Sequence, residues 1–212
     1  MNGARDEILG RVREALRDVP GDERAEDVTV PRDYRHTGDP TVDRLALFAE
    51  RVEHYEASVL TVTDDALAAA VATRLAERGV HRVVVPLDLP DEWLAATDAD
   101  VVRDDGTLTP RRLDELDGVV TGCAIAVAET GTFVLDAGAA QGRRALTLVP
   151  DYHLCVVLAG QVVATVPEAV ARLDPMRPLT WVSGPSATSD IELSRVEGVH
   201  GPRTLDVLLV DR

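Results

Sequence analysis

The chain has 212 residues, and its 37 acidic residues outnumber its 22 basic ones, which gives a formal net charge of −15. This excess of negative charge argues against binding to nucleic acid or to an anionic membrane. All 22 basic residues are arginines, so reactions that need a lysine amine, such as Schiff-base chemistry, are excluded. The length fits one α/β domain with an extension.

The sequence has no pattern typical of a membrane or secretory segment. No apolar run reaches the roughly 18 residues of a membrane span, and the first residues lack the apolar core of a signal peptide. We therefore expect a soluble, cytoplasmic protein. Cys123 and Cys155 lie in apolar runs and are expected to be buried. Two cysteines cannot supply the thiolates of a usual iron–sulfur cluster, so we expect no cofactor bound by this chain alone.

Residues 1–39 are predicted to form an extension of the domain. Residues 5–17 place Ile8, Val12 and Leu16 at helical spacing, which is typical of an amphipathic helix. Residues 19–39 are rich in Pro, Gly, Asp and Glu, which favours a linker. We expect the helix to pack on its own body. It is also the element through which we would expect an oligomer to form.

Residues 40–116 alternate between helical and strand patterns. Such alternation indicates βαβ units and a parallel sheet. The predicted helices cover residues 40–55, 65–78, 91–96 and 110–116, and the predicted strands cover residues 58–62, 81–86 and 100–103.

Residues 119–135 consist of two apolar runs on either side of Glu129, Thr130, Gly131 and Thr132. The spacing fits either a tight hairpin or a strand that breaks at Glu129. A carboxylate between two buried strands is costly unless it is hydrogen-bonded, paired or placed at a pocket. Glu129 is therefore a candidate functional residue, with a solvated turn glutamate as the alternative.

A loop of small residues, 136–144, ends in Arg143 and Arg144. Both are candidates for binding an anionic substrate or an acidic partner, and for at least one of them a solvated surface arginine is the better interpretation. His153 lies close to Asp151 but is interpreted as structural, because neighbouring side chains in a turn usually point apart. The predicted strands here cover residues 145–149, 154–158 and 161–163, and a helix is predicted over residues 166–173.

The C-terminal stretch contains the densest group of small, polar and charged residues. Residues 183–188 are predicted to form a turn that opens a helix, with Asp190 and Glu192 in its first turn, where acidic side chains complement the helix dipole. Free backbone N–H groups at such a helix start favour an anion. A helix cap followed by a Gly-Pro turn at 198–203 is the alternative without a ligand. The flanking apolar runs predicted as strands are residues 179–182 and 205–210.

Four motifs occur in order along the chain: AETGT at residues 128–132, LVPDYH at 148–153, SGPSATSDIE at 183–192 and GVHGPR at 198–203. Together they resemble the lactate utilization protein C family, the small single-domain branch of the LUD-domain proteins, over residues 40–212. The resemblance implies an α/β fold with three layers, α/β/α, and a mostly parallel open sheet. Sugar-phosphate isomerases and coenzyme A transferases share this fold. In this chain the N-terminal helix precedes the α/β domain.

The resemblance also implies a function. The chain would be one component of a multi-protein system that oxidises L-lactate to pyruvate. In that system separate iron–sulfur proteins carry the clusters, so those proteins are the expected partners and a small carboxylate is the expected substrate. The chain shows no glycine-rich dinucleotide fingerprint, so electrons would leave through a partner or through a cofactor held elsewhere.

A lactate site needs a clamp for the carboxylate and a base for the hydroxyl proton. We expect one site, at the carboxyl edge of the sheet where open α/β folds place ligands. Glu129 and His200 are the candidate catalytic residues. The candidate binding residues are Thr130, Gly131, Thr132, Arg143, Ser183, Gly184, Ser186, Thr188, Asp190, Glu192, Gly201 and Arg203.

Two alternatives stay open. Glu129-Thr130-Gly131 is similar to the glutamate nucleophile context of coenzyme A transferases, which would make the chain a stand-alone acyl or coenzyme A transferase. The chain could instead be a non-catalytic scaffold that binds a metabolite. No metal is expected, because the five histidines are scattered and show no ligand spacing.

Overall fold

The structure is a computed structural model that describes all residues except 1–2, 23, 25–28, 189–195, 198–200 and 212. It divides into two compact units, Met1–Tyr34 and Arg35–Arg212. The first unit contains helix α1, Gly3–Ala15, whose apolar side chains Ile8 and Val12 are exposed. Among the helices described, none combines the length and the apolar composition that a membrane crossing needs.

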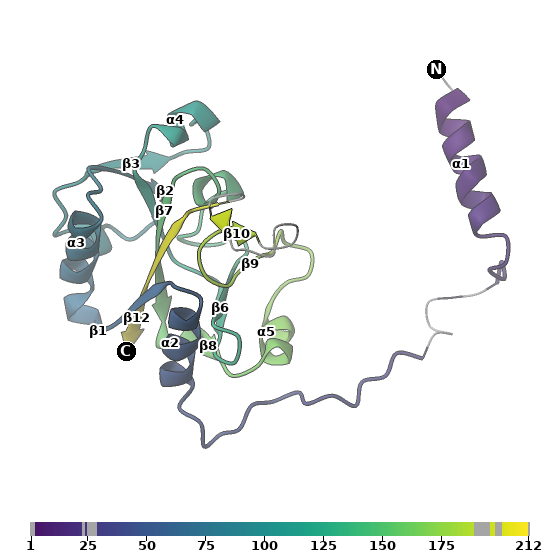
Figure 1. Cartoon of the computed structure of the whole chain (residues 1–212), viewed down its shortest axis with the longest axis horizontal. Coiled ribbons are helices and arrows are strands. Elements are labelled where there is room, and N and C mark those ends of the chain that lie inside the picture. Colours follow the sequence, from purple (N-terminus) through teal and green to yellow (C-terminus); the bar gives the residue numbers. More distant parts are fainter. Residues whose placement is uncertain (1–2, 23, 25–28, 189–195, 198–200, 212) are drawn as a thin grey trace. The chain divides into compact units, whose positions relative to one another are not determined.

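The second unit is built on a six-stranded sheet in which every neighbouring pair is parallel, in the order β1-β12-β7-β4-β2-β3 (Figure 1). This sheet and its flanking helices confirm the predicted α/β class. The strands are β1 Ser58–Thr63, β2 Arg82–Pro86, β3 Asp100–Asp104, β4 Gly118–Thr121, β7 Tyr152–Leu158 and β12 Thr204–Asp211.

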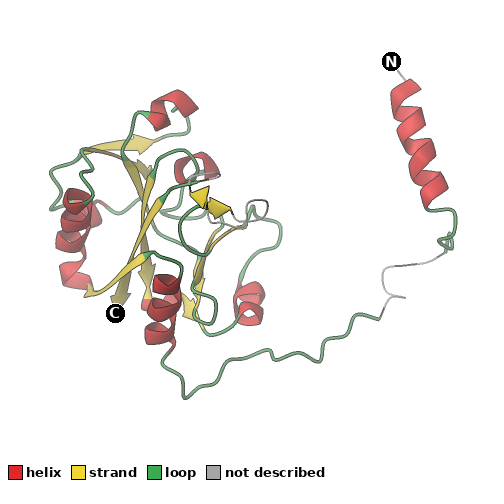
Figure 2. Cartoon of the chain, viewed as in Figure 1, coloured by secondary structure: helices red, strands yellow, loops and turns green. Residues whose placement is uncertain are grey.

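Strand β12 shows why the sheet lies at the centre of the core. Its residues 205–210 are all buried, as expected for a parallel strand covered on both faces. Leu208 packs in a cluster with helix α3, whereas Leu209 packs in a cluster with helix α2. Figure 2 shows these helices on opposite sides of the sheet. The helices of this unit are α2 Arg44–His54, α3 Leu67–Glu77, α4 Pro110–Asp114 and α5 Val166–Arg172.

A second, four-stranded sheet in the order β8-β5-β6-β9 lies on the α2 side of the main sheet (Figure 1). The sequence patterns did not predict this sheet. The antiparallel pair β5–β6 settles one open alternative, because residues 119–135 contain a hairpin with Glu129 in its turn. Its strands are β5 Ile125–Val127, β6 Thr132–Leu135, β8 Val162–Val163 and β9 Thr180–Val182.

Two local predictions are wrong. Residues 145–149 do not form a strand, because Arg144–Thr147 is a 3₁₀ turn whose Leu146 is buried in a cluster with Val84 and Leu113. Strand β10, Ala187–Thr188, pairs antiparallel with β11, Val196–Glu197. The turn predicted over residues 183–188 therefore ends in a short strand. The residues that follow it, Asp190 and Glu192 among them, lie outside the described part. The other 3₁₀ turns are Asp64–Ala66, Asp91–Leu94 and Ala159–Gln161.

Candidate functional site

A cavity of about 200 Å³ lies at the amino ends of β7 and β12. Strand β7 contributes His153 and strand β12 contributes Leu205. Strand β9 and the residues that follow it, 183–186, form another part of the cavity wall. The lining residues are Arg144, Thr147, His153, Thr180, Trp181, Val182, Ser183, Gly184, Pro185, Ser186, Gly201, Pro202 and Leu205.

The position of this cavity differs from the expected one. The sequence rule places a site at the carboxyl ends of parallel strands, whereas this cavity opens at the amino ends of β7 and β12. The reason is the second sheet, whose edge strand β9 ends here and delivers residues 183–186. Backbone bonds fix the loops around it, since Ser186 N donates to Pro202 O at 2.8 Å and Thr204 N donates to Asp151 O at 3.2 Å.

Among the described residues that line the cavity, Arg144 is the one arginine. Its Nη1 donates to the carbonyl oxygen of Thr147 at 2.9 Å and to the Thr147 hydroxyl at 3.0 Å. Partial burial lowers the pKa of Arg144, although its side chain keeps contact with solvent. Within the described part of the chain, no carboxylate forms an ion pair with it. A cation that lacks a counter-ion inside a pocket is suited to bind an anion.

Arg143, the adjacent candidate, has a different role. Its Nε and Nη2 donate to the two carboxylate oxygens of Asp104 at 2.8 and 3.0 Å, and Nη2 also donates to Leu108 O at 2.5 Å. The carboxylate of Asp104 is 3 % exposed. Arg143 therefore compensates a buried charge and does not line the cavity.

His153 forms part of the cavity wall. It is 2 % exposed, its Nε2 lies 2.8 Å from Thr121 Oγ1, and its ring meets Phe133 edge to face. Burial, with a smaller contribution from the charge of Arg144, lowers the pKa of His153 to about 3. The ring is neutral at ordinary pH, so it can form hydrogen bonds but is a weak base. The sequence analysis interprets His153 as a structural residue. The feature that indicates a cavity residue is a titratable side chain at the start of an otherwise apolar strand.

The TGT part of the first motif reaches the cavity through hydroxyl groups. Thr130 Oγ1 donates to Thr132 Oγ1 at 2.8 Å, and Thr132 Oγ1 lies 2.7 Å from Ser183 Oγ on the cavity wall. Gly131 has a structural reason to be glycine. Its φ is +58°, and an added Cβ would lie 2.7 Å from Val52 N of helix α2.

The remaining predicted residues divide between the cavity and other places. Four of them line the cavity: Ser183, Gly184, Ser186 and Gly201. The cavity thus brings together parts of the SGPSATSDIE and GVHGPR motifs. Glu129 does not line it, and its carboxylate is paired with Arg35 at 2.5 Å.

Other predicted residues serve the surrounding structure or lie outside the described part. Arg203 forms a two-pronged pair with Asp151, and this bond lowers the pKa of Asp151. Thr188 lies in β10. His200, Asp190 and Glu192 fall outside the described residues.

No group suited to hold a metal is present among the residues described. Cys123 and Cys155 are both buried free thiols, as predicted, and burial raises the pKa of Cys155.

The fold and cavity define a class of small α/β proteins in which a parallel sheet carries a second sheet against one face. The model of the LUD domain matches residues 45–210, and the chain belongs to this family.

Relatives and a solved structure agree with this assignment. Lactate utilization protein C of Deinococcus radiodurans is 50 % identical over 170 residues, which cover 78 % of this chain and 79 % of that protein. Lactate utilization protein C of Geobacillus thermodenitrificans is 28 % identical over 193 residues, covering 80 % of each chain. The crystal structure of a DUF162 family protein from Deinococcus radiodurans superimposes with a TM-score of 0.67 and 41 % identity, covering 79 % of this chain and 96 % of that one.

Proposed function

We propose that this protein takes part in lactate utilization and that its cavity binds a small monocarboxylate such as L-lactate. The names of the relatives support the pathway. The observation that carries the binding proposal is Arg144, a cavity cation without a carboxylate partner among the described residues.

The dimensions and chemistry of the cavity favour this class of ligand. Its volume of about 200 Å³ suits a molecule of a few heavy atoms and is small for coenzyme A or a nucleotide. Arg144 would bind the carboxylate, Ser183 and the neutral ring of His153 would face the hydroxyl, and Leu205 would contact the methyl group. One cation suits one negative charge, which favours a monoanion over a phosphate or a dicarboxylate.

The protein would act as one component of a larger system. His153 is a weak base because of its low pKa, and Glu129 lies outside the cavity wall, so the described residues support ligand binding better than proton abstraction. Two cysteines in the whole chain are too few for a usual iron–sulfur cluster. Electrons from lactate would therefore pass to separate iron–sulfur partner proteins.

The test is growth on L-lactate as the sole carbon source. A strain that lacks the gene should fail to grow and should recover with the intact gene. The same gene carrying Arg144→Ala should rescue growth poorly. A control carrying Arg74→Ala should rescue it fully, because Arg74 lies on α3 and does not line the cavity. Normal growth of the deletion strain, without a paralogue, would overturn the pathway. Full rescue by Arg144→Ala would overturn the role of the cavity.

A further inference from the structure

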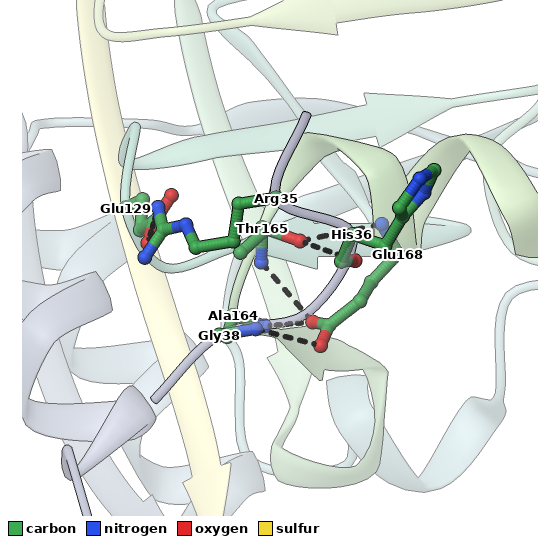
Figure 3. Close-up of polar contacts among 7 residues, drawn as sticks. All are labelled: Arg35, His36, Gly38, Glu129, Ala164, Thr165 and Glu168. Carbon is green, nitrogen blue, oxygen red and sulfur yellow. Dashed lines mark hydrogen bonds and ion pairs between the residues drawn. The ribbon is translucent and has the colours of Figure 1, made fainter. Parts of the chain in front are cut away.

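Residues Arg35–Gly38 form an extended segment that lies on the turn of the β5–β6 hairpin and on the start of α5 (Figure 3). Arg35 Nη2 donates to Glu129 Oε1 at 2.5 Å. The hydroxyl of Thr165 donates to the carbonyl oxygen of His36 at 3.4 Å, and Gly38 N donates to Glu168 Oε1 at 3.2 Å. Contacts thus occur at both ends of the segment and in its middle.

The surface that contacts the segment is held by hydrogen bonds at the start of α5. Glu168 closes the capping box of α5, and its Oε2 accepts from Ala164 N at 2.7 Å and from Thr165 N at 3.1 Å. Burial raises the pKa of Glu168, but the backbone N–H groups of Gly38, Thr165 and Ala164 outweigh it, so the net pKa is lowered. The carboxylate therefore stays charged and in place.

Gly38 fits this surface because it has no side chain. An added Cβ would lie 2.2 Å from Ala164 Cβ, which is far inside van der Waals contact. The segment can approach α5 this closely only with glycine at this position. The close approach places Arg35, three residues earlier, opposite Glu129.

The contact that Arg35 makes is of a kind that exchanges readily. The side chains of Arg35 and Glu129 are 63 % and 33 % exposed, and ion pairs on a surface contribute little and weaken with salt. Arg35 also directly follows the unit Met1–Tyr34.

We propose that residues Arg35–Gly38 are a releasable clasp in which Arg35 neutralises and covers Glu129. In the clasped form the carboxylate of Glu129 is withheld from any other cation or electrophile. In the released form it is available on the hairpin turn. This inference does not depend on the proposed role in lactate utilization.

Carbodiimide labelling of the full-length protein tests the clasp. A water-soluble carbodiimide converts an accessible carboxylate to an O-acylisourea, and glycine ethyl ester then displaces the urea to give a stable amide. Peptide mass spectrometry gives the labelling rate of Glu129. Arg35→Ala should raise this rate about two- to fivefold, the range that a surface ion pair allows. Gly38→Val should raise it similarly, because the added side chain cannot fit against Ala164.

Arg74→Ala is the matched control, since Arg74 pairs with Glu77 at 3.2 Å on the surface of α3. It should raise the labelling of Glu77 and leave Glu129 unchanged. Higher salt should accelerate the labelling of Glu129 in the wild type but not in Arg35→Ala. An unchanged rate in Arg35→Ala overturns the clasp. So does an unchanged rate in a folded Gly38→Val protein, since Arg35 would then reach Glu129 without the segment. If Gly38→Val does not fold, Arg35→Ala and the salt series decide the question.

Discussion

The cavity at the amino ends of β7 and β12 and the face formed by the β5–β6 hairpin and α5 both contain charged residues and residues of the sequence motifs. Their charges are compensated differently. On the hairpin face, Glu129 is paired with Arg35, and Glu168 accepts three backbone N–H groups. In the cavity, Arg144 donates to neutral oxygens of Thr147. Dense motifs mark both regions, so charge compensation, and not motif density, distinguishes the cavity from the hairpin face.

Arg143 and Arg144 show the same difference within two adjacent residues. Arg143 holds the buried carboxylate of Asp104, whereas Arg144 faces the cavity. A substitution of Arg143 should therefore mainly lower the stability of the protein, and a substitution of Arg144 should mainly weaken ligand binding.

The largest expected effect is on stability. Arg143→Ala leaves Asp104 buried without its partner, and breaking a buried pair costs about 3–5 kcal/mol. Because Arg143 is partly exposed, we expect the free energy of unfolding to fall by about 2–3 kcal/mol, after discounting for solvent screening. Urea denaturation measures this change. Arg143→Ala/Asp104→Asn, which removes both charges, should recover part of the loss. A stable Arg143→Ala protein with weakened carboxylate binding would reverse the two assigned roles.

Arg144→Ala should mainly affect binding. Loss of a charge-assisted hydrogen bond should weaken the binding of L-lactate about 10- to 100-fold. The free energy of unfolding should fall by only about 1 kcal/mol, because the hydrogen bonds to Thr147 are lost but no buried charge is left unpaired. Isothermal titration calorimetry measures the affinity. Arg144→Lys should retain part of the affinity, because it keeps the charge but loses the planar donor pair. Equal affinity in wild type and Arg144→Ala would remove the cavity from consideration.

The sequence predicted the main sheet better than the second one. Residues 205–210 of β12 are all buried, and five of the six are apolar, the exception being Asp206. Such a pattern indicates a strand covered on both faces. The second sheet depends on pairs between short segments far apart in the chain, such as Phe133 with Val182 and Ala126 with Val162. Strands of two to four residues carry too little periodicity to reveal such pairs.

Some of the predicted site residues line the cavity and others do not. Residues 183–186 and Gly201 belong to the motifs that the sequence singled out, and they line the cavity. Which of two adjacent arginines faces it could not be predicted, because the deciding partner, Asp104, lies 39 residues away. The cavity lies at the amino edge of the sheet, because the second sheet delivers its own loop there. The usual rule for open α/β sheets does not consider such a loop.

The buried ring of His153 should make stability depend on pH. Its pKa is lowered from 6.5 to about 3 on folding, so the unfolded chain binds a proton first. The stabilisation is fully present above pH 6.5 and is lost as pH falls from 6.5 toward 3. The slope should approach about 1.4 kcal/mol per pH unit below the unfolded pKa.

Urea denaturation between about pH 5 and 6.5 isolates this effect, because most carboxylates titrate below that range. His153→Gln can keep a hydrogen bond to Thr121 but cannot titrate, so its slope should be much smaller. The surface histidine variant His54→Gln is the control and should keep the wild-type slope. Identical slopes in His153→Gln and the wild type would show that His153 can be protonated in the folded state.

The smallest expected effect is that of Thr132→Val, which tests whether the hairpin face and the cavity are separate. Thr132 is 4 % exposed, and its hydroxyl joins Thr130 of the hairpin to Ser183 of the cavity. Thr132→Val removes these bonds and should lower the free energy of unfolding by about 1 kcal/mol. Ser183 remains at the end of β9, so L-lactate affinity should fall less than about threefold, the equivalent of half of one hydrogen bond.

Paired measurements of urea denaturation and L-lactate affinity decide between two outcomes, with Thr130→Val as the control that leaves the bond between Thr132 and Ser183 intact. A loss of stability with nearly unchanged affinity means that the hydroxyl chain serves the scaffold. A larger loss of affinity in Thr132→Val than in Thr130→Val means that the hairpin sets the position of Ser183. Glu129 and its clasp would then act on the cavity through this chain, and the two regions would be one site with two differently charged ends.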